Sequence, residues 1–276
     1  MQLSREKIES LKRYMAEKGR DGVVIAFSGG LDSSTLAAVS RNVLGDKAVA
    51  VTAKSPTYPA EELEDAKKVA KEIGIKLYVI ETNELMNEKF SRNPENRCYY
   101  CKKELLKQLQ KTAEEMGFKA VFEGTNLSDL TEHRPGFKAV KEAGNVYSPW
   151  VETQFTKEEI RALARELGLS IYNKPPLACL ASRIPYHEKI TAERLERIEK
   201  AEQTVRRMTG VQQLRVRDHN GLARIEVGKD ERKIFCDISL MDRVAHELKK
   251  IGFKYVALDL EGYKSGSMLL TLETTA

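Results

Sequence analysis

The spacing of hydrophobic residues over the first 170 positions alternates between two patterns. Short continuous apolar runs, typical of strands buried on both faces, occupy residues 23–27, 48–52, 77–80 and 120–122. Apolar residues at every third or fourth position, typical of helices, mark residues 4–19, 33–44, 61–73, 102–116 and 156–168. Strands that alternate with helices predict right-handed crossovers and a doubly wound, mostly parallel α/β sheet.

The pattern changes after Asn173-Lys174-Pro175-Pro176, a segment that disfavours regular structure. Beyond it we predict, in order, a helix, two strands joined by a turn at Asn220-Gly221, a second helix and a closing strand, at residues 192–208, 213–216, 222–227, 239–251 and 255–260. This order indicates a smaller C-terminal α+β domain. We therefore divide the chain into domains at residues 1–175 and 176–276.

The composition narrows the class of protein. The 276 residues suit about two domains, and 41% of them are hydrophobic, enough for a sizeable core. No apolar run approaches the ~20 residues of a membrane span, and the charged N-terminus lacks a signal core, so we expect a cytoplasmic protein without a membrane partner. Four cysteines are too few for a disulfide framework in a chain of this length.

The net charge of +5 is spread along the chain. Residues 1–190 contain 30 basic and 27 acidic residues, and residues 191–276 contain 16 and 14. A nucleic-acid-binding module normally concentrates its basic residues on one element or surface. We therefore do not expect a nucleic-acid partner.

The first apolar run is followed by Ser28-Gly29-Gly30-Leu31-Asp32-Ser33-Ser34, between a predicted strand and a predicted helix. Two glycines permit a tight turn that brings N–H groups toward an anion, and the helix start adds unpaired N–H groups. The hydroxyls of Ser28, Ser33 and Ser34 suit phosphate oxygens, and Asp32 suits a Mg²⁺ ion carried by them. The alternative is a plain strand–turn–helix corner with Asp32 or Ser33 as the N-cap.

The seven residues match the signature SGGxDSS, so this segment resembles the PP-loop (N-type) ATP pyrophosphatases, whose domain is adenine nucleotide alpha-hydrolase-like. These proteins split ATP between the α and β phosphates. The resemblance extends to Glu123-Gly124-Thr125-Asn126 after the fourth predicted strand, a segment that alone could be an ordinary turn. Thr52 and Lys54 end the second strand, where a doubly wound sheet receives its ligand. We assign ATP binding to these residues together with the loop.

Cys98 and Cys101 form a CxxC pair, whereas Cys179 and Cys236 stand alone. The pair suits structural zinc, a redox dithiol or part of an iron–sulfur site. We interpret Cys236, which follows apolar residues, as a small buried core residue. The remaining Cys98, Cys101 and Cys179 suit a [4Fe–4S] cluster with one iron left open. The alternative for Cys179 is a buried cysteine between domains.

Around Cys179 the sequence resembles the LarE family of ATP-dependent sulfur transferases. Residues 178–186, ACLASRIPY, are similar to the family's ACLxSRIPYG, and Arg134-Pro135-Gly136 is a second shared piece. The chain departs from the family pattern at Ser128, His133 and His187, which affects local binding details more than the family assignment.

The resemblance implies adenylation of a carboxylate on a pyridinium biscarboxylate mononucleotide, with release of pyrophosphate. Sulfur then displaces AMP to give a thiocarboxylate of the nickel-pincer cofactor. In three-cysteine members the residues matching Cys98, Cys101 and Cys179 carry a [4Fe–4S] cluster whose extra sulfide can be the donor. In single-cysteine members the residue matching Cys179 gives up its own sulfur. Because this chain has all three, we expect the cluster, with sulfide or another sulfur donor as partner. Family members are often hexamers built on trimers, which implies a homo-oligomer.

The candidate catalytic residues are Cys179, Asp32 and Arg183, since the Arg183 charge would favour a Cys179 thiolate if both face one cleft. For the small-molecule nucleotide substrate the candidates are Arg134, Ser182, Arg183, Arg215 and Arg217. By alternation, Arg215 and Arg217 share one strand face, where a substrate phosphate could bind. A solvated strand face is the equal alternative.

Three other functions share part of these features. A tRNA thiolase uses the same loop and a similar cluster, but should show a basic surface or additional zinc-finger cysteines. A non-catalytic adenine-nucleotide-binding protein would use Cys98 and Cys101 for structural zinc. An NAD- or GMP-synthetase-like amidotransferase would not need the three cysteines.

Overall fold

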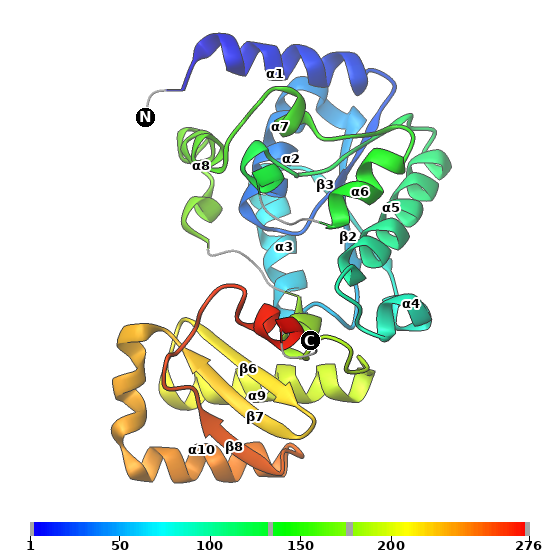
Figure 1. Cartoon of the computed structure of the whole chain (residues 1–276). Coiled ribbons are helices and arrows are strands. Elements are labelled where there is room, and N and C mark those ends of the chain that lie inside the picture. The colour runs from blue at the N-terminus through cyan, green and yellow to red at the C-terminus, as the bar shows by residue number, and fades with distance from the viewer. Residues whose placement is uncertain (1–2, 132–134, 175–178, 274–276) are drawn as a thin grey trace. The chain divides into compact units, whose positions relative to one another are not determined.

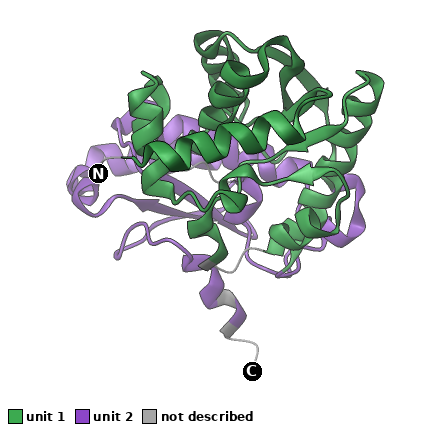
Figure 2. Cartoon of the chain, turned by 90° about the horizontal axis from the view of Figure 1, so that it is seen from above, with its two compact units in different colours: residues 1–84, 96–177 green, residues 85–95, 178–276 purple. Residues whose placement is uncertain are grey.

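The computed structural model describes residues 3–131, 135–174 and 179–273, and the chain in it separates into two compact units. Figure 2 colours the first unit, residues 1–84 with 96–177, and the second unit, residues 85–95 with 178–276. In the part of the chain that the structure describes, no helix is both long enough and apolar enough to cross a membrane.

Helices and strands alternate through the first unit (Figure 1). Its helices are α1 (Arg5–Lys18), α2 (Leu31–Leu44), α3 (Ala60–Ile73), α5 (Arg97–Glu115), α6 (Pro135–Glu142), α7 (Pro149–Glu152) and α8 (Lys157–Glu166). Its strands are β1 (Val23–Ala26), β2 (Ala48–Lys54), β3 (Lys76–Glu81), β4 (Ala120–Phe122) and β5 (Val146–Tyr147). The strands form one parallel sheet in the order β3-β2-β1-β4-β5, which confirms the predicted α/β fold.

Neighbouring residues of β1 point to opposite faces of this sheet. Val23 and Ile25 are buried in a core shared with α1, α2, α3 and α8, whereas Val24 is buried in a second core shared with α5 and α6. The strands read as continuous apolar runs because helices cover both faces. Since all five strands run the same way, their carboxyl ends meet at one edge, where the loop after β1 begins.

The second unit is built around a three-stranded sheet (Figure 1). Its elements are α4 (Glu88–Ser91), α9 (Ala192–Thr209), β6 (Leu214–His219), β7 (Leu222–Val227), α10 (Ile238–Lys250), β8 (Tyr255–Leu258) and α11 (Leu270–Glu273). β6 and β7 are antiparallel, and β8 runs parallel to β7. One face of the sheet packs on α9 and α10 through residues such as Val216, Val205 and Val244. This α+β arrangement confirms the prediction for the C-terminal region.

Residues 85–95 belong to the second unit, although residues of the first unit flank them on both sides. The backbone carbonyl of Ser91 accepts a hydrogen bond from Ile190 at 2.8 Å, and that of Asn93 accepts one from His187 at 2.9 Å. The Asn93 side-chain amide is buried and donates to the carbonyl of Pro185 at 2.6 Å. Nothing in the hydrophobic pattern of residues 85–95 indicates this exchange.

Two local predictions are wrong. Helix α5 begins at Arg97 rather than at residue 102, so Cys98 and Cys101 lie in its first turns. The helical spacing of apolar residues starts only after the cysteines, which is why the pattern misses these turns. Cys236 is exposed at the end of a short 3₁₀ helix, while its neighbour Phe235 occupies the core position. The short elements β5, α6 and α7 also escape a reading based on periodicity.

Candidate active site

The loop between β1 and α2 depends on its two glycines. Gly29 has φ +70°, and a Cβ atom there would lie 2.8 Å from the Cα of Ala66 in α3. Gly30 is the N-cap of α2 and has no side chain that could bond the N–H groups of the first turn. Neither Asp32 nor Ser33 is therefore the N-cap of α2, contrary to that part of the alternative interpretation. A helix start without a side-chain cap leaves N–H groups and the positive dipole end for an anion.

The serine hydroxyls of this loop differ in how well they are satisfied. The Oγ atoms of Ser28 and Ser33 lie 3.0 Å apart, and Ser33 Oγ also donates to the carbonyl of Gly30 at 3.3 Å. Ser34 Oγ is buried and has no hydrogen-bond partner among the described residues. An unsatisfied buried hydroxyl costs about 1–3 kcal/mol, so Ser34 fits a site in which a ligand oxygen supplies the missing partner.

Asp32 lies in the first turn of α2, and both of its carboxylate oxygens have partners. Asn126 Nδ2 donates to Oδ1 at 3.3 Å, and Lys157 Nζ at the start of α8 forms a short ion pair with Oδ2. Burial raises the pKa of Asp32 even though Lys157 opposes the rise, and the charge of Asp129 adds to it. The loop therefore holds a carboxylate that a nearby cation must balance.

The segment after β4 packs directly against this loop. A Cβ atom on Gly124 would lie 3.2 Å from the backbone nitrogen of Ser33. Asn126 is fully buried and bonds both Asp32 and Asp129, the latter through its backbone nitrogen at 3.1 Å. Two of the three residues predicted here, Gly124 and Asn126, are thus brought to the loop.

Glu123, the first residue of the segment that resembles the family's nucleotide-side motif, is the centre of a buried polar network. Its carboxylate accepts hydrogen bonds from Lys102 Nζ at 2.9 Å, from Thr125 Oγ1 at 2.7 Å and from Ser148 Oγ. Burial would raise the pKa of Glu123, but Lys102 and these hydrogen bonds outweigh it and the pKa is lowered. The ionised carboxylate ties α5, which carries Cys98 and Cys101, to the segment after β4.

The remaining predicted nucleotide residues lie at the end of β2. Thr52 is buried, whereas Lys54 is exposed and forms an ion pair with Glu81 at 3.3 Å. Sequence reasoning missed Lys157 and Lys102, which reach the site from distant segments. The capping box of Thr156 and Glu159 marks the start of α8, but no local signal says which loop that start faces.

The three candidate cluster ligands are divided between the two units. Cys98 and Cys101 lie one helical turn apart in the first unit, and Cys179 precedes the 3₁₀ helix Leu180–Arg183 in the second. None of the three is in a disulfide, so each can supply the thiolate sulfur that iron–sulfur clusters use. Within residues 3–131, 135–174 and 179–273, no group of three or more His, Cys, Asp or Glu is arranged to hold a metal ion. The cluster stays a prediction.

Arg183 is buried and holds the backbone beside Cys179. Its Nε and Nη2 atoms donate to the two carboxylate oxygens of Glu202 at 2.8 and 3.0 Å, and its Nη1 atom donates to the carbonyl of Cys179 at 3.1 Å. Burial would raise the pKa of Glu202, but the charge and hydrogen bonds of Arg183, a hydrogen bond from the Val216 backbone and the charge of Arg215 outweigh it, and the pKa is lowered. This buried pair links the Cys179 segment to α9.

The two arginines of β6 differ in charge balance. Arg217 is 5% exposed, pairs with Glu226 at 2.6 Å and donates to the carbonyl of Ser182 at 3.0 Å. Arg215 lies over the ring of Tyr263, 5.2 Å from its centroid, and forms no ion pair with the residues that the structure describes. The interpretation as a solvated strand face is wrong for Arg217, which is buried, whereas Arg215 is partly exposed. Arg134, the other candidate, lies outside the described residues.

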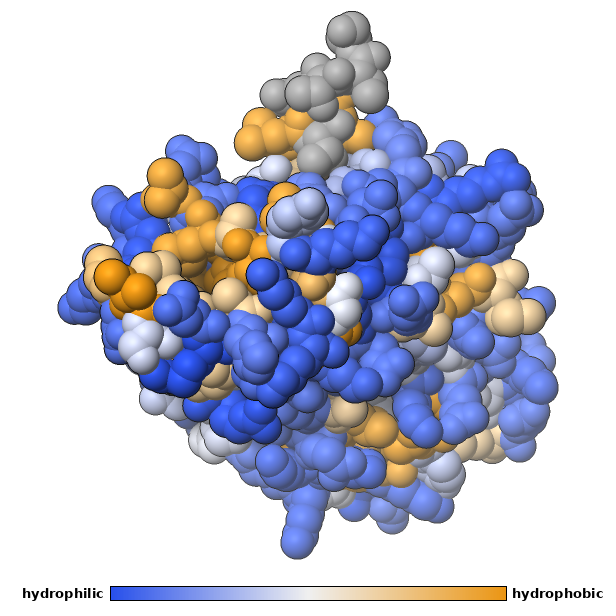
Figure 3. All heavy atoms as spheres, turned by 90° about the horizontal axis from the view of Figure 1, so that it is seen from below, coloured by the Kyte–Doolittle hydropathy of each residue, from blue (hydrophilic) through white to orange (hydrophobic). Residues whose placement is uncertain are grey.

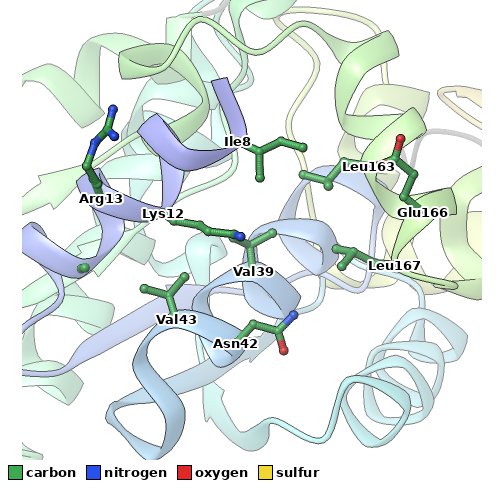
Figure 4. Close-up of a pocket in the computed structure, with 10 residues that line it drawn as sticks. Ile8, Lys12, Arg13, Val39, Asn42, Val43, Leu163, Glu166 and Leu167 are labelled. Atoms are coloured by element: carbon green, nitrogen blue, oxygen red, sulfur yellow. The ribbon is translucent and has the colours of Figure 1, made fainter. Parts of the chain in front are cut away.

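A separate groove of about 660 Å³ lies between α1, α2 and α8 (Figure 4). It is lined mainly by apolar side chains, among them Ile8, Val39 and Leu163, with Lys12 and Arg13 on the α1 side. None of the residues predicted to bind nucleotide, substrate or cluster lines this groove. It is therefore distinct from the candidate site at the carboxyl ends of the strands.

The parallel sheet, its strand order and the glycine loop after β1 define a nucleotide-binding domain of the PP-loop class. In agreement with this class, residues 3–123 match the protein family described as NAD synthase.

Two relatives extend the match over almost the whole chain. An uncharacterized protein from Synechocystis is 44% identical over 262 residues, which cover 95% of this chain and 96% of that protein. The pyridinium-3,5-bisthiocarboxylic acid mononucleotide synthase of Lactiplantibacillus plantarum is 37% identical over 258 residues, 93% of this chain and 92% of the synthase. A tRNA-specific 2-thiouridylase of Rickettsia canadensis is 29% identical over 188 residues, 55% of this chain and 51% of that enzyme. The chain belongs to the family of the mononucleotide synthase, the LarE family.

Proposed function

We propose that the protein is an ATP-dependent sulfur transferase that converts a carboxylate of a pyridinium biscarboxylate mononucleotide into a thiocarboxylate, a step in making the nickel-pincer cofactor. The observation that carries this proposal is the nearly end-to-end match to the mononucleotide synthase. The 2-thiouridylase matches about half of each chain, which favours the small mononucleotide over tRNA as substrate. We place the reaction in the cytoplasm, where thiols stay reduced.

In the first step, a carboxylate oxygen of the substrate attacks the α phosphorus of ATP. The bond between the α phosphorus and the bridging oxygen breaks, which leaves an acyl adenylate and pyrophosphate. The loop after β1 offers the pyrophosphate the N–H groups at the start of α2 and the hydroxyls of Ser28, Ser33 and Ser34. Asp32 would hold, together with the phosphates, the Mg²⁺ ion that neutralises their charge.

In the second step, sulfur attacks the activated carboxyl carbon and AMP leaves. Cys98, Cys101 and Cys179 would hold a [4Fe–4S] cluster, which when bound supplies an iron that can carry the sulfide. Arg183 fixes the backbone of Cys179. Arg215 would receive the phosphate of the substrate, because it forms no ion pair with a carboxylate of the described residues and lies over the ring of Tyr263.

Mass spectrometry after anaerobic incubation with ATP, Mg²⁺, sulfide and the pyridinium biscarboxylate mononucleotide tests the function. We expect one substrate oxygen to be replaced by sulfur, with one AMP and one pyrophosphate released per sulfur. An unmodified mononucleotide alongside thiolated bulk tRNA would overturn the proposal in favour of a tRNA thiolase.

Iron and sulfide analysis of anaerobically purified protein tests the cluster. About four iron atoms per chain are expected, and Cys179→Ala should lose them. Stoichiometric zinc in their place would contradict the cluster and support a structural role for Cys98 and Cys101.

We assign sulfur transfer and oligomerisation to the second unit, and we propose that the protein is a homo-oligomer, a trimer or a hexamer. Most large exposed apolar side chains belong to this unit, among them Ile238, Met241, Tyr255 and Leu260. Figure 3 shows apolar side chains gathered in separate patches on one face of an otherwise hydrophilic surface. Contacts between copies would remove such side chains from water. Light scattering after size exclusion measures the oligomeric state, and a monomer would contradict the assignment.

A further inference from the structure

We propose that Lys157 is the phosphate-binding lysine of this site, supplied from the start of α8 and held by Asp32 until a nucleotide arrives. The proposal rests on ATP use as proposed above and adds a residue that the loop itself lacks. Walker-type loops carry a lysine within the loop, whereas residues 28–34 contain no basic residue. The structure brings one to the loop from 125 positions further along the chain.

The backbone of Lys157 is fixed, whereas its ammonium group has one hydrogen-bond partner, Asp32, among the described residues. Its nitrogen donates to Ser128 Oγ at 3.1 Å, and the preceding Thr156 caps α8 in a capping box with Glu159. Glu159 in turn pairs with Lys7 of α1 at 2.7 Å, which anchors the start of the helix from a second side. The four-carbon stem of Lys157 can therefore swing from one acceptor to another without movement of the helix.

The charge balance of the site explains why the Lys157 ammonium would move from Asp32 to the phosphates. A polyphosphate must approach a loop that carries the partly buried Asp32 carboxylate, and like charges at close range repel strongly when they are partly buried. Lys157 balances Asp32 while no other cation is present. When Mg²⁺ takes the carboxylate, the ammonium becomes available to the phosphates beside it.

Three other lysines of the first unit, Lys102, Lys54 and Lys174, form ion pairs with carboxylates other than Asp32. Lys102 is bound to the fully buried Glu123, and Lys54 is bound to Glu81. Lys174 is held by two carboxylates, those of Glu62 and Asp65. Among the described residues, Asp32 is the one ion-pair partner of Lys157, and Asp32 is also the residue expected to bind the metal ion. Nucleotide binding would therefore release Lys157 and leave the others in place.

Calorimetry with inorganic pyrophosphate, with and without Mg²⁺, tests the proposal on the full-length protein. Lys157→Gln should weaken pyrophosphate binding about tenfold or more, equivalent to ~1.4 kcal/mol, and Lys157→Arg should recover part of the affinity. The matched control is Lys12→Gln, which removes an exposed ion pair with Glu9 on α1 and touches neither the loop nor the start of α8. It should leave the affinity unchanged.

The same measurement in the Asp32→Asn background separates phosphate binding from simple charge balance. If Lys157 contacts the phosphates, Lys157→Gln still weakens binding in that background. If the effect disappears there, or if Lys157→Gln binds pyrophosphate as tightly as the natural protein, the proposal is overturned. Thermal unfolding of each variant identifies a loss of affinity that comes from misfolding, in which case Lys157→Arg decides. Pyrophosphate binding needs neither the mononucleotide nor sulfur, so failure of the proposed sulfur transfer leaves this test intact.

Discussion

The loop after β1 and the group formed by Arg183 and Arg217 near Cys179 both contain side chains that can bind anions. They differ in how many of these side chains already have partners within the protein. At the loop, Ser34 Oγ is buried without a partner in the described residues and α2 begins without a side-chain cap. Near Cys179, Arg183 forms an ion pair with Glu202 and Arg217 forms one with Glu226, and all four side chains are almost fully buried. The loop therefore has polar groups left over for a ligand, whereas the two arginines already have carboxylate partners.

This difference separates binding from positioning. A buried arginine that is paired with a carboxylate has little charge left for a substrate, but it fixes whatever its remaining N–H groups contact. Here those contacts are the backbone carbonyls of Cys179 and Ser182. Arg215, which forms no ion pair with the described residues, is the arginine of this region best suited to an anionic substrate.

The largest effect should come from Cys179→Ala. Thiocarboxylate formation should fall on the order of a thousandfold, because the sulfur-carrying group loses a ligand, while pyrophosphate release should stay within about twofold. Rapid-quench assays of both products in one reaction measure the split. An equal loss of thiocarboxylate formation and pyrophosphate release would contradict the assignment of adenylation to the loop and of sulfur transfer to the region of Cys179.

Glu202→Gln tests whether the arginine pairs are structural. Removing one partner of a buried ion pair costs about 3–5 kcal/mol, so the free energy of unfolding should fall by that amount. Glu196→Gln, on the same helix, breaks an exposed pair with Lys200 and should cost less than about 0.5 kcal/mol. Urea denaturation measures both, and similar costs would refute the distinction.

The same carboxylate predicts the direction of a pH effect. The pKa of Glu202 is lowered from 4.5 in the folded protein, so its stabilising effect is fully present above pH 4.5 and is lost as the pH falls toward the folded pKa. The unfolding free energy should decline in that window, and the decline should be smaller in Glu202→Gln. Urea titrations between about pH 3 and pH 6 would show identical slopes if another group dominates.

Arg215→Gln should raise the KM for the phosphorylated substrate about tenfold, with kcat and ATP binding nearly unchanged, since it removes a charge–phosphate contact of about 1.4 kcal/mol. The comparison variant is Arg224→Gln, because Arg224 is already balanced by Asp259 at 2.6 Å. Steady-state kinetics distinguish the two, and an equal rise in KM would remove the special status of Arg215.

The smallest effect is expected for Ser34→Ala, and it should have opposite signs in two measurements. Removing an unsatisfied buried hydroxyl should leave stability unchanged or raise it by up to about 1 kcal/mol, whereas pyrophosphate affinity should fall severalfold. Thermal unfolding and calorimetry report the two signs. A clear loss of stability would show that Ser34 is satisfied in the free protein and that the loop is less open than described.

The sequence was sufficient for what is local. Residues 28–34 carry a contiguous motif between an apolar strand and a helix, and both flanking elements lie where the apolar pattern predicts them. The fold class followed from the alternation of strands and helices, because burial on both faces leaves continuous apolar runs.

What escaped prediction depends on contacts between distant segments. The pairs Lys157–Asp32 and Lys102–Glu123 join elements that no single stretch of sequence brings together. Cys236 follows apolar residues, yet Phe235 is the buried residue of the 3₁₀ helix that contains both, and Cys236 is exposed. Periodicity identifies which elements form, whereas their partners are decided by tertiary packing.

The assignment of residues 85–95 to the second unit has a consequence for biosynthesis. During translation this segment leaves the ribosome before residues 96–177. It cannot form its hydrogen bonds to Pro185, His187 and Ile190 until those later residues have been made. Until then, the Asn93 amide lacks the carbonyls of Ile184 and Pro185 to which it donates in the folded protein. A chain that ended after residue 177 would contain all five strands of the parallel sheet. Residues 85–95 would then lack the unit they pack in, and we expect chaperones and proteases to bind this exposed segment.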